Sequence, residues 1–487
     1  KGVSLDGNFS DPERPFFIPS NASQVSLYEF LLDSFSEENQ DTQEEDINAF
    51  VNFTLPTDLF GFGSGTIKFG GRLRIKDKFR DNNFFEFAPT SNNPQAFATL
   101  ANVPTSDLTD PDYFPGSQYA AGTFMTNDFL GSLDFNNASL FDKEDVPDEY
   151  LRGNYNVSED VFAGYVMANQ KVSEKLSVLA GVRVEATQIE ATGNQIQDEE
   201  QLLGEITEES SYTNILPGVH FKYDVNDNTV VRLAWTNTLA RPNYEDLVPS
   251  RDVIVEDSEI VLGNPDLDPT TSMNFDLMAE HYFDNVGLLS GGVFYKQIND
   301  FIYTQIGEVA SGQPNAGFRT FQPLNGDDAY ITGAEFAFQR QLDFLPGFAK
   351  NLGVYLNYTY LDSKANGIKN EDGDDRGDLT LPGATPNMFN GSLGYTDKKF
   401  TARLSVNYSD AYIDELGGEE FEDRYYDEQF FMDFNVSYAF SENLRVFADL
   451  TNITNQPLRY YQGIRSRTQQ IEFYDRRFTI GLKYDLF

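Results

Sequence analysis

Apolar and polar residues alternate one by one along much of the chain. In residues 66–78, for example, Ile67 and Leu73 fall on one face of an extended chain, and Arg72 and Arg74 fall on the other. Successive side chains of a strand point to opposite faces, so this period of two predicts β-strands with one apolar and one polar face. The pattern recurs in residues 47–55, 176–186, 215–223, 231–235, 273–283, 352–360, 400–408, 432–440, 444–450 and 478–486.

Two-faced segments of about 10 residues are typical of membrane β-barrels, although soluble antiparallel sandwiches also alternate. Bulky charges at strand centres suit a water-filled lumen, and aromatic residues near strand ends suit the membrane interfaces. The chain has 43 Phe and 26 Tyr. It contains no run of roughly 20 apolar residues, the length that a membrane helix needs. The predicted fold is therefore all-β, a transmembrane antiparallel β-barrel.

The connections between these segments alternate between short and long. The short ones are residues 224–228, 284–287, 397–399 and 441–443, and the long ones are residues 79–158, 192–210, 240–269, 307–327, 362–382 and 411–429. Outer-membrane barrels have short periplasmic turns and long extracellular loops. The alternation therefore favours a membrane barrel over a sandwich.

Counting back from the last segment gives about 15 strands, whereas bacterial single-chain barrels have an even number. We therefore expect the first strands to lie outside this chain. Residues 1–45 are predicted to be an extracellular loop segment, and residues 46–487 the barrel. The alternative is an additional strand within residues 79–158, which contain several aromatic residues.

The charge balance limits the partners. The chain has 77 acidic and 35 basic residues and a formal net charge of -42. Nucleic-acid binding needs basic patches, so no nucleic-acid partner is expected. The acidity indicates either a solvated, self-repelling surface or outer loops that bind cations. With no Cys and two His residues, a thiolate metal site or a multi-histidine site is not expected.

Two segments carry a family resemblance. Residues 236–248 read TNTLARPNYEDLV, and residues 263–272 read GNPDLDPTTS. In this order and separation they resemble the ARP and GNPxLxPxxS steps of TonB-dependent receptors. Residues 330–336, 450–455 and 477–487 resemble further segments of that family, and the likeness covers residues 160–487.

The resemblance implies a barrel of about 22 strands whose lumen is closed by an N-terminal plug domain. This chain would supply about strands 8 to 22, with the plug and the first strands absent from it. The implied function is import of a scarce ligand (a siderophore, cobalamin, glycan or peptide) across the bacterial outer membrane, energised through TonB. The implied surroundings are outer-membrane lipid and lipopolysaccharide, the TonB complex reached through the plug, and a surface lipoprotein.

Other functions stay open from the sequence. The main alternative is a structural or scaffold barrel within a larger outer-membrane complex, followed by a passive porin and a soluble all-β carbohydrate-binding protein. An enzyme is not expected, because the HExxH, GxSxG, Walker and dinucleotide motifs are absent.

A basic ladder is the first candidate binding site. Lys68, Arg72, Arg74 and Lys76 alternate along one predicted strand and point toward the lumen. They would attract an anionic ligand such as a ferric chelate or an acidic glycan. The alternative is that they pair with acidic side chains of neighbouring strands or of the plug.

The outer loops supply two more candidates. Phe421, Tyr425 and Tyr426 lie in a charged run that is either a ligand-binding loop or a polar rim. Asn370, Asp372, Asp374 and Asp378 are candidate Ca²⁺ ligands, because the first three have the spacing of a calcium loop. The sixth and twelfth positions of that loop are not the Gly and Glu of an EF-hand, so a solvated acidic loop is the alternative. No other cofactor is expected.

Overall fold

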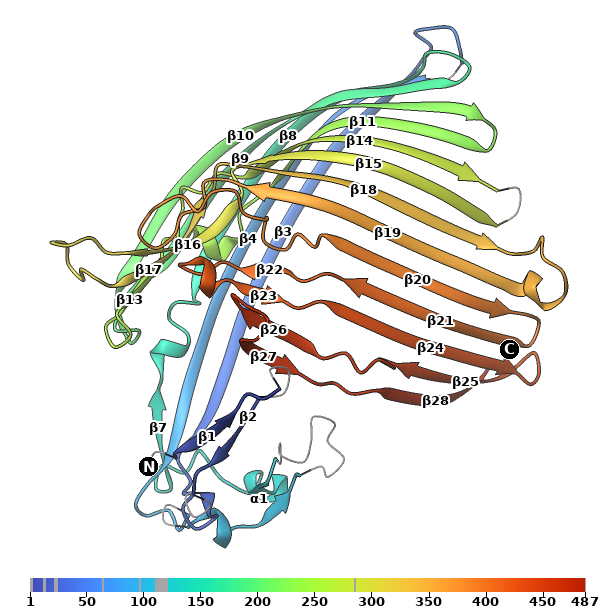
Figure 1. Ribbon diagram of the computed structural model, residues 1–487. Helices are drawn as coiled ribbons and strands as arrows, with labels where there is room; N and C mark the ends of the chain where they lie inside the picture. The colour runs from blue at the N-terminus through green and yellow to red at the C-terminus, as the bar shows by residue number, and fades with distance from the viewer. Residues whose placement is uncertain are drawn as a thin grey trace.

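One curved antiparallel sheet dominates the computed structural model, which describes residues 3–11, 15–21, 25–63, 65–95, 98–109, 121–283 and 286–486 (Figure 1). Fifteen strands pair one after another in this wall. They are β3 (Phe35–Thr57), β4 (Gly65–Pro89), β8 (Tyr155–Lys171), β9 (Leu176–Gln197), β10 (Gln201–Asn226), β11 (Thr229–Ala240), β14 (Thr270–Tyr282), β15 (Gly287–Asn299), β18 (Asp328–Gln341), β19 (Leu352–Ala365), β20 (Asn387–Thr396), β21 (Phe400–Ser409), β24 (Gln429–Ala439), β25 (Leu444–Thr451) and β28 (Arg477–Tyr484).

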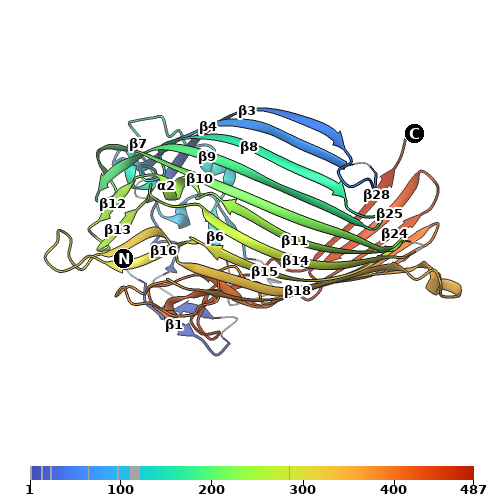
Figure 2. The same ribbon diagram turned by 90° about the horizontal axis from the view of Figure 1, so that it is seen from above.

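The strands follow the order of a barrel wall, and every neighbouring pair is antiparallel. Among the described residues no register joins β28 to β3, so these two strands are the edges of the wall (Figure 2). Strand β3 begins at Phe35. The boundary that the sequence predicted at residue 46 therefore falls inside a strand.

The wall is a single layer. Leu404 lies opposite Leu393 and Phe434 on the neighbouring strands and is 39% exposed. Leu482 lies opposite Val446 and is 65% exposed. An apolar core between two stacked sheets would bury these residues. Their exposure on one face fits a wall whose apolar side is turned outward.

The two ends of the wall differ in the length of their connections, as the sequence predicted. Turns such as residues 227–228 and 397–399 close one end, and the longer connections lie at the other. The predicted loop at residues 192–210 is wrong, because β9 and β10 stay paired up to a turn at residues 198–200. This hairpin is far longer than the roughly 9–11 residues that cross a membrane. Polar residues fill most of its projecting part, and the buried apolar residues there (Ile189, Ala191 and Ile196) do not keep one phase, so the sequence lacks a continuous alternation.

The long connections contain short strands and turns of helix. Strands β12 (Arg251–Ile254) and β13 (Glu259–Leu262) form a hairpin that pairs in parallel with the end of β9 on one side and with β17 on the other. The remaining short strands of the connections are β7 (Phe141–Asp145), β16 (Ile302–Glu308), β17 (Arg319–Asn325), β22 (Tyr412–Glu415), β23 (Arg424–Tyr426), β26 (Leu458–Gln462) and β27 (Thr468–Glu472). In the part of the chain that the structure describes, the register of strand β7 is with the last residues of β4, so it adds no full strand to the wall.

A small outer region lies at the end of β3 and β4 (Figure 1). It contains β1 (Leu5–Asn8), β2 (Phe16–Pro19), β5 (Thr105–Asp107), β6 (Thr123–Met125), η2 (Leu100–Asn102) and α1 (Asn127–Leu130). The other helical turns are η3 (Pro147–Glu149), α2 (Tyr244–Leu247), η4 (Gly347–Asn351) and η5 (Glu420–Glu422). In the described residues, every helix is too short or too polar to cross a membrane.

Candidate functional site

The predicted basic ladder lies on β4 and is largely engaged by β3. Arg74 Nε is 2.9 Å from Asp46 Oδ2, and Lys76 Nζ is 2.8 Å from Glu44 Oε1. Arg72 Nε donates to the side-chain oxygen of Asn48 at 3.0 Å. Lys68 lies opposite Thr54 and has no ion pair among the described residues. These contacts favour the interpretation of the ladder as a charge network over that of a free anion-binding surface.

A buried ion network joins this ladder to the ARP step. Arg241 follows β11, and its Nη2 is 2.7 Å from Glu185 Oε2 and 3.2 Å from Thr187 Oγ1. Its Nε lies 3.5 Å from a carboxylate oxygen of Glu159, which is 2% exposed. Arg74 Nη1 approaches the same carboxylate at 3.8 Å. A buried carboxylate persists only when it is paired, so Arg241 holds the chain after β11 against the wall.

Residues 241–267, here called the signature segment, cover part of the inner face of the wall. Leu247 and Val248 are 1% exposed and pack against Val157 of β8 and Ile189 of β9. The interior face of a membrane barrel is usually polar. These wall positions are apolar because the signature segment shields them from water.

Glycine is required where the first part of the signature segment passes close to its last part. A Cβ built on Gly263 would lie 1.7 Å from the carbonyl oxygen of Val248. The amide of Gly263 donates to Ser250 O at 3.0 Å, and the amide of Asn264 donates to Asp246 O at 2.7 Å. The ARP and GNP steps are therefore halves of one folded unit, which explains their order and separation.

A pocket of about 390 Å³, here called the mouth pocket, lies beside the signature segment at the loop end of the wall. Four separate loops contribute to it. Its lining is Arg241, Pro242, Asn243, Asp246, Ile302, Tyr303, Thr304, Pro323, Pro382, Asp414, Glu415 and Leu416. Asp246 accepts a hydrogen bond from the Asn243 side chain at 3.3 Å, and burial raises the pKa of the Asp246 carboxyl.

The predicted aromatic residues lie near the outer loops but not in one place. Tyr425 and Tyr426 are adjacent on β23, so their rings point to opposite faces. The ring of Tyr425 stacks on Tyr461 at 5.1 Å, and that of Tyr426 packs on Tyr460 at 4.9 Å. Burial raises the pKa of both phenols. Phe421 is 54% exposed and has no ring contact with either tyrosine in the described residues.

The candidate calcium residues form a turn between β19 and β20. The side-chain oxygen of Asn370 accepts from the amide of Asp374 at 2.8 Å, and Asp378 pairs with Lys364 at 2.9 Å. Asp372 and Asp374 are exposed. The part of the chain that the structure describes has no group of three or more His, Cys, Asp or Glu side chains arranged to hold a metal. Calcium binding therefore stays a prediction from spacing.

A buried ion pair ties this turn to the next loop. Arg376 donates from Nη1 and Nη2 to the two carboxylate oxygens of Asp423, at 3.0 and 2.7 Å. The side chains are 6% and 1% exposed. Bidentate pairs of this kind fix orientation as well as distance. The outer loops on this side of the mouth pocket are thus joined to one another.

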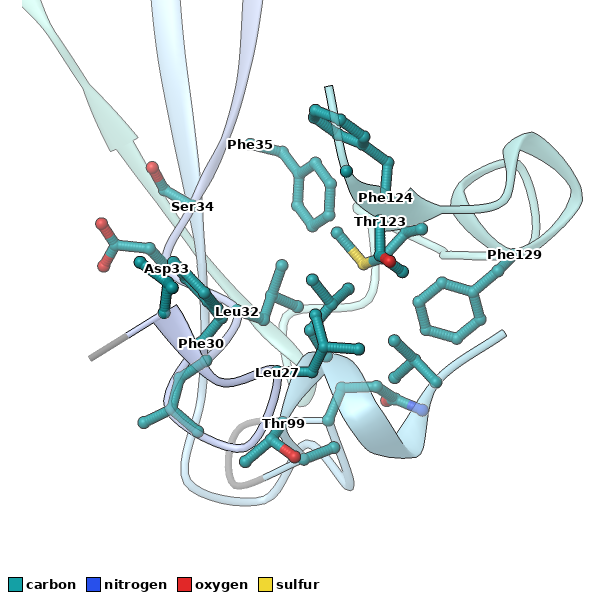
Figure 3. A pocket seen from close by; sticks show the side chains of 18 of the residues that line it. Leu27, Phe30, Leu32, Asp33, Ser34, Phe35, Thr99, Thr123, Phe124 and Phe129 are labelled. Carbon is teal, nitrogen blue, oxygen red and sulfur yellow. The ribbon is translucent and has the colours of Figure 1, made fainter. Parts of the chain in front are cut away.

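A second cavity of about 680 Å³ lies in the small outer region. Figure 3 shows the rings of Phe35, Phe124 and Phe129 around it, while the carboxylate of Asp33 points away from these rings. Its walls are mostly apolar, the polar lining residues Ser34, Gln95, Thr99 and Thr123 are uncharged, and its one charged lining residue, Asp33, points its carboxylate away from the rings.

The sequence did not identify the central residues of the ion network. Glu159, Glu185 and Arg241 come from β8, β9 and the chain after β11, and only the strand pairing brings them together. A charge placed in an apolar stretch is a usable signal. Glu159 stands between Val157 and Val161, which share its face and are also buried.

Comparison with known proteins gives one family. A sequence profile described as TonB dependent receptor-like, beta-barrel matches residues 2–453. No curated protein sequence matches the chain.

Solved structures with the same fold share little sequence. The siderophore receptor PiuA from Acinetobacter baumannii superimposes with a TM-score of 0.55 at 11% identity, over 91% of this chain and 56% of that chain. The ferric citrate transporter FecA, in its unliganded form, gives 0.55 at 12% identity, over 92% and 55%. The pyoverdine receptor FpvA from Pseudomonas aeruginosa PAO1 gives 0.55 at 13% identity, over 93% and 55%. The chain thus spans little more than half the length of these structures.

Proposed function

Because the chain belongs to the TonB-dependent receptor β-barrel family, whose members are integral outer-membrane proteins, we propose that it forms much of the wall of a TonB-dependent importer. The family consists of receptors and transporters rather than enzymes. We further propose that the wall is part of a barrel of about 22 strands with a plug in its lumen. The ligand would be a siderophore, cobalamin, a glycan or a peptide.

The signature segment is the observation that carries this proposal. It holds the two sequence steps that resemble the family, folds against the inner wall through Arg241, and lines the mouth pocket with Asp246. A ligand in the mouth pocket would therefore lie against a segment that is fixed to the inner wall. This arrangement supports ligand capture at the loop end of the lumen, before passage inward.

Energy coupling would come from TonB acting on the plug, since the outer membrane has no proton gradient of its own to use. Lipid and lipopolysaccharide would surround the apolar face of the wall. A surface lipoprotein over the loops is a further proposed partner. Two of the similar solved structures are named as a siderophore receptor and a ferric citrate transporter. Iron chelates are therefore the first ligands to test.

Deletion of the gene in its host tests the proposal. We expect a growth defect on one limiting nutrient, and the same defect when TonB is deleted instead. Restoring the intact gene should rescue growth only in cells that have TonB. Rescue that is independent of TonB would favour a porin, and a defect in envelope integrity without any nutrient dependence would favour a scaffold.

A further inference from the structure

The mouth pocket holds more carboxylate charge than its cations balance. Arg424 is shared between two lining residues, with its Nη2 2.6 Å from Asp414 and 2.8 Å from Glu415. One guanidinium thus faces two carboxylates. Asp246 has only the neutral amide of Asn243 beside it, and no cation of the described residues lies within ion-pair distance. Two carboxylate charges are left without a counter-ion.

Arg241 does not supply the missing positive charge. It is the one basic residue of the lining, but its guanidinium is already engaged by Glu185 and Glu159. Arg183 and Arg74 approach the same two carboxylates from the wall. Asp46 also pairs with Arg74, so three carboxylates face three guanidinium groups and the network is balanced. The field in the pocket therefore comes from Asp246, Asp414 and Glu415.

The rest of the lining is uncharged apart from Arg241, with Asn243, Tyr303 and Thr304 as polar members beside a set of apolar ones. Pro242, Ile302, Pro323, Pro382 and Leu416 complete the walls around the carboxylates. A volume of about 390 Å³ is near the lower end for small-molecule sites. The pocket therefore suits one charged group on a short aliphatic stem, with methylenes against the prolines and the charge at the carboxylates.

Building on the proposed function, we propose that the mouth pocket recognises a cationic amine or guanidine group of the imported ligand, as a basic peptide or a polyamine would carry. A cation gains charge-assisted hydrogen bonds to the carboxylates, which are stronger than neutral ones. An anionic group meets two unbalanced negative charges in a partly desolvated site, where repulsion is stronger than in bulk water. The same pocket thus disfavours anionic chelates.

Calorimetric titration of the purified full chain in lipid nanodiscs tests this inference. The probes are tri-lysine, spermidine, tri-lysine acetylated on its side-chain amines, and tri-glutamate. We expect tri-lysine or spermidine to bind, and the acetylated and acidic peptides to bind at least about 10-fold more weakly. Preference for tri-lysine identifies a peptide, and preference for spermidine identifies a polyamine.

A double variant locates the binding. Asp246→Asn with Glu415→Gln should weaken cation binding by about 10-fold or more. The matched control is Glu256→Gln with Asp257→Asn, which removes two exposed charges outside the pocket lining. It should leave binding unchanged. Circular dichroism and the thermal midpoint establish that both variants are folded.

Several results would overturn the inference. These are equal binding of the acetylated and free peptides, tighter binding of tri-glutamate, absence of cation binding, or equal weakening by both double variants. The last result would mean diffuse attraction to an acidic protein. TonB-dependent uptake of an anionic ligand would leave the proposed function standing while removing this inference. Cation binding without TonB-dependent growth would do the reverse.

Discussion

Arg241 and Glu185 are joined by an ion pair of 2.7 Å that ties the chain after β11 to the inner face of β9. The same guanidinium lies 3.5 Å from Glu159, the more deeply buried carboxylate. Removal of Arg241 would leave two carboxylates with one fewer cation in a dry environment. The stability of this region should therefore depend on one side chain.

Arg241→Gln should lower the stability of the protein by about 3 kcal/mol, because it leaves Glu159 buried with incomplete pairing. Thermal unfolding in lipid nanodiscs, followed by circular dichroism, measures the loss. Arg232→Gln is the control, since it breaks a more exposed pair with Glu280 and should cost below about 1 kcal/mol. Equal losses in the two variants would contradict the importance of burial.

Gly263→Ala should disrupt the signature segment, because the new Cβ would lie 1.7 Å from Val248 O. Moving that backbone apart should cost about 3 kcal/mol. Faster proteolysis within residues 241–267 would reveal it. Gly218→Ala, whose Cβ would meet its nearest atom at 3.7 Å, should have little effect. A folded and protease-resistant Gly263→Ala protein would show that the close approach is not needed.

Arg376→Gln should loosen the two outer loops that the Arg376–Asp423 pair joins. Asp423 is 1% exposed, so its carboxylate would lose its main partner while still buried. Hydrogen exchange should rise in residues 366–386 and 411–428, with the wall strands unchanged. Lys364→Gln breaks an exposed pair with Asp378 and should change exchange far less. Identical exchange in both variants would rule out a special role for the buried pair.

The β12–β13 hairpin should be held more firmly in mild acid. Burial raises the pKa of Asp252, and nearby Arg152 only partly opposes the rise. The folded state thus binds this proton more tightly than the unfolded chain does. The cost of burying the charge is present at neutral pH and is relieved as the pH falls through the raised pKa.

A spin label at Glu256→Cys can report this change, since the chain has no other cysteine. We expect the label to become less mobile as the pH is lowered from neutral toward 5. Adding Asp252→Asn should abolish the change. A pH response that survives this substitution would assign it to another group.

The strands were predictable where one face of the wall is apolar and the other is polar. Residues 66–78 alternate in this way and lie in β4, and residues 478–484 of the last predicted segment lie in β28. Prediction failed where strands project into water, as in the first part of β3 and the outer half of the β9–β10 hairpin. The first part of β3 is polar on both faces, and the few apolar residues of the outer hairpin half do not keep one phase. Pairing rather than composition makes these segments strands.

The candidate site was predictable only in part. The order of the ARP and GNP steps marked the signature segment, but not what Arg241 contacts. Its partners lie on β8 and β9, far away in the sequence. A local sequence pattern cannot predict which distant side chains an arginine will contact. The partners of the basic ladder could not be predicted either, because the residues opposite Arg74 and Lys76 are set by the register of β3 against β4.

The apolar patch under the signature segment has a consequence for assembly. Val157 and Ile189 precede Leu247 in the chain, by up to about 90 residues, so an N-terminal start to folding would leave the patch uncovered. A folding intermediate in which β8 and β9 are already paired would expose this apolar patch to water and would tend to aggregate. Membrane insertion of this protein should therefore depend on chaperones that bind the exposed patch until Leu247 and Val248 cover it.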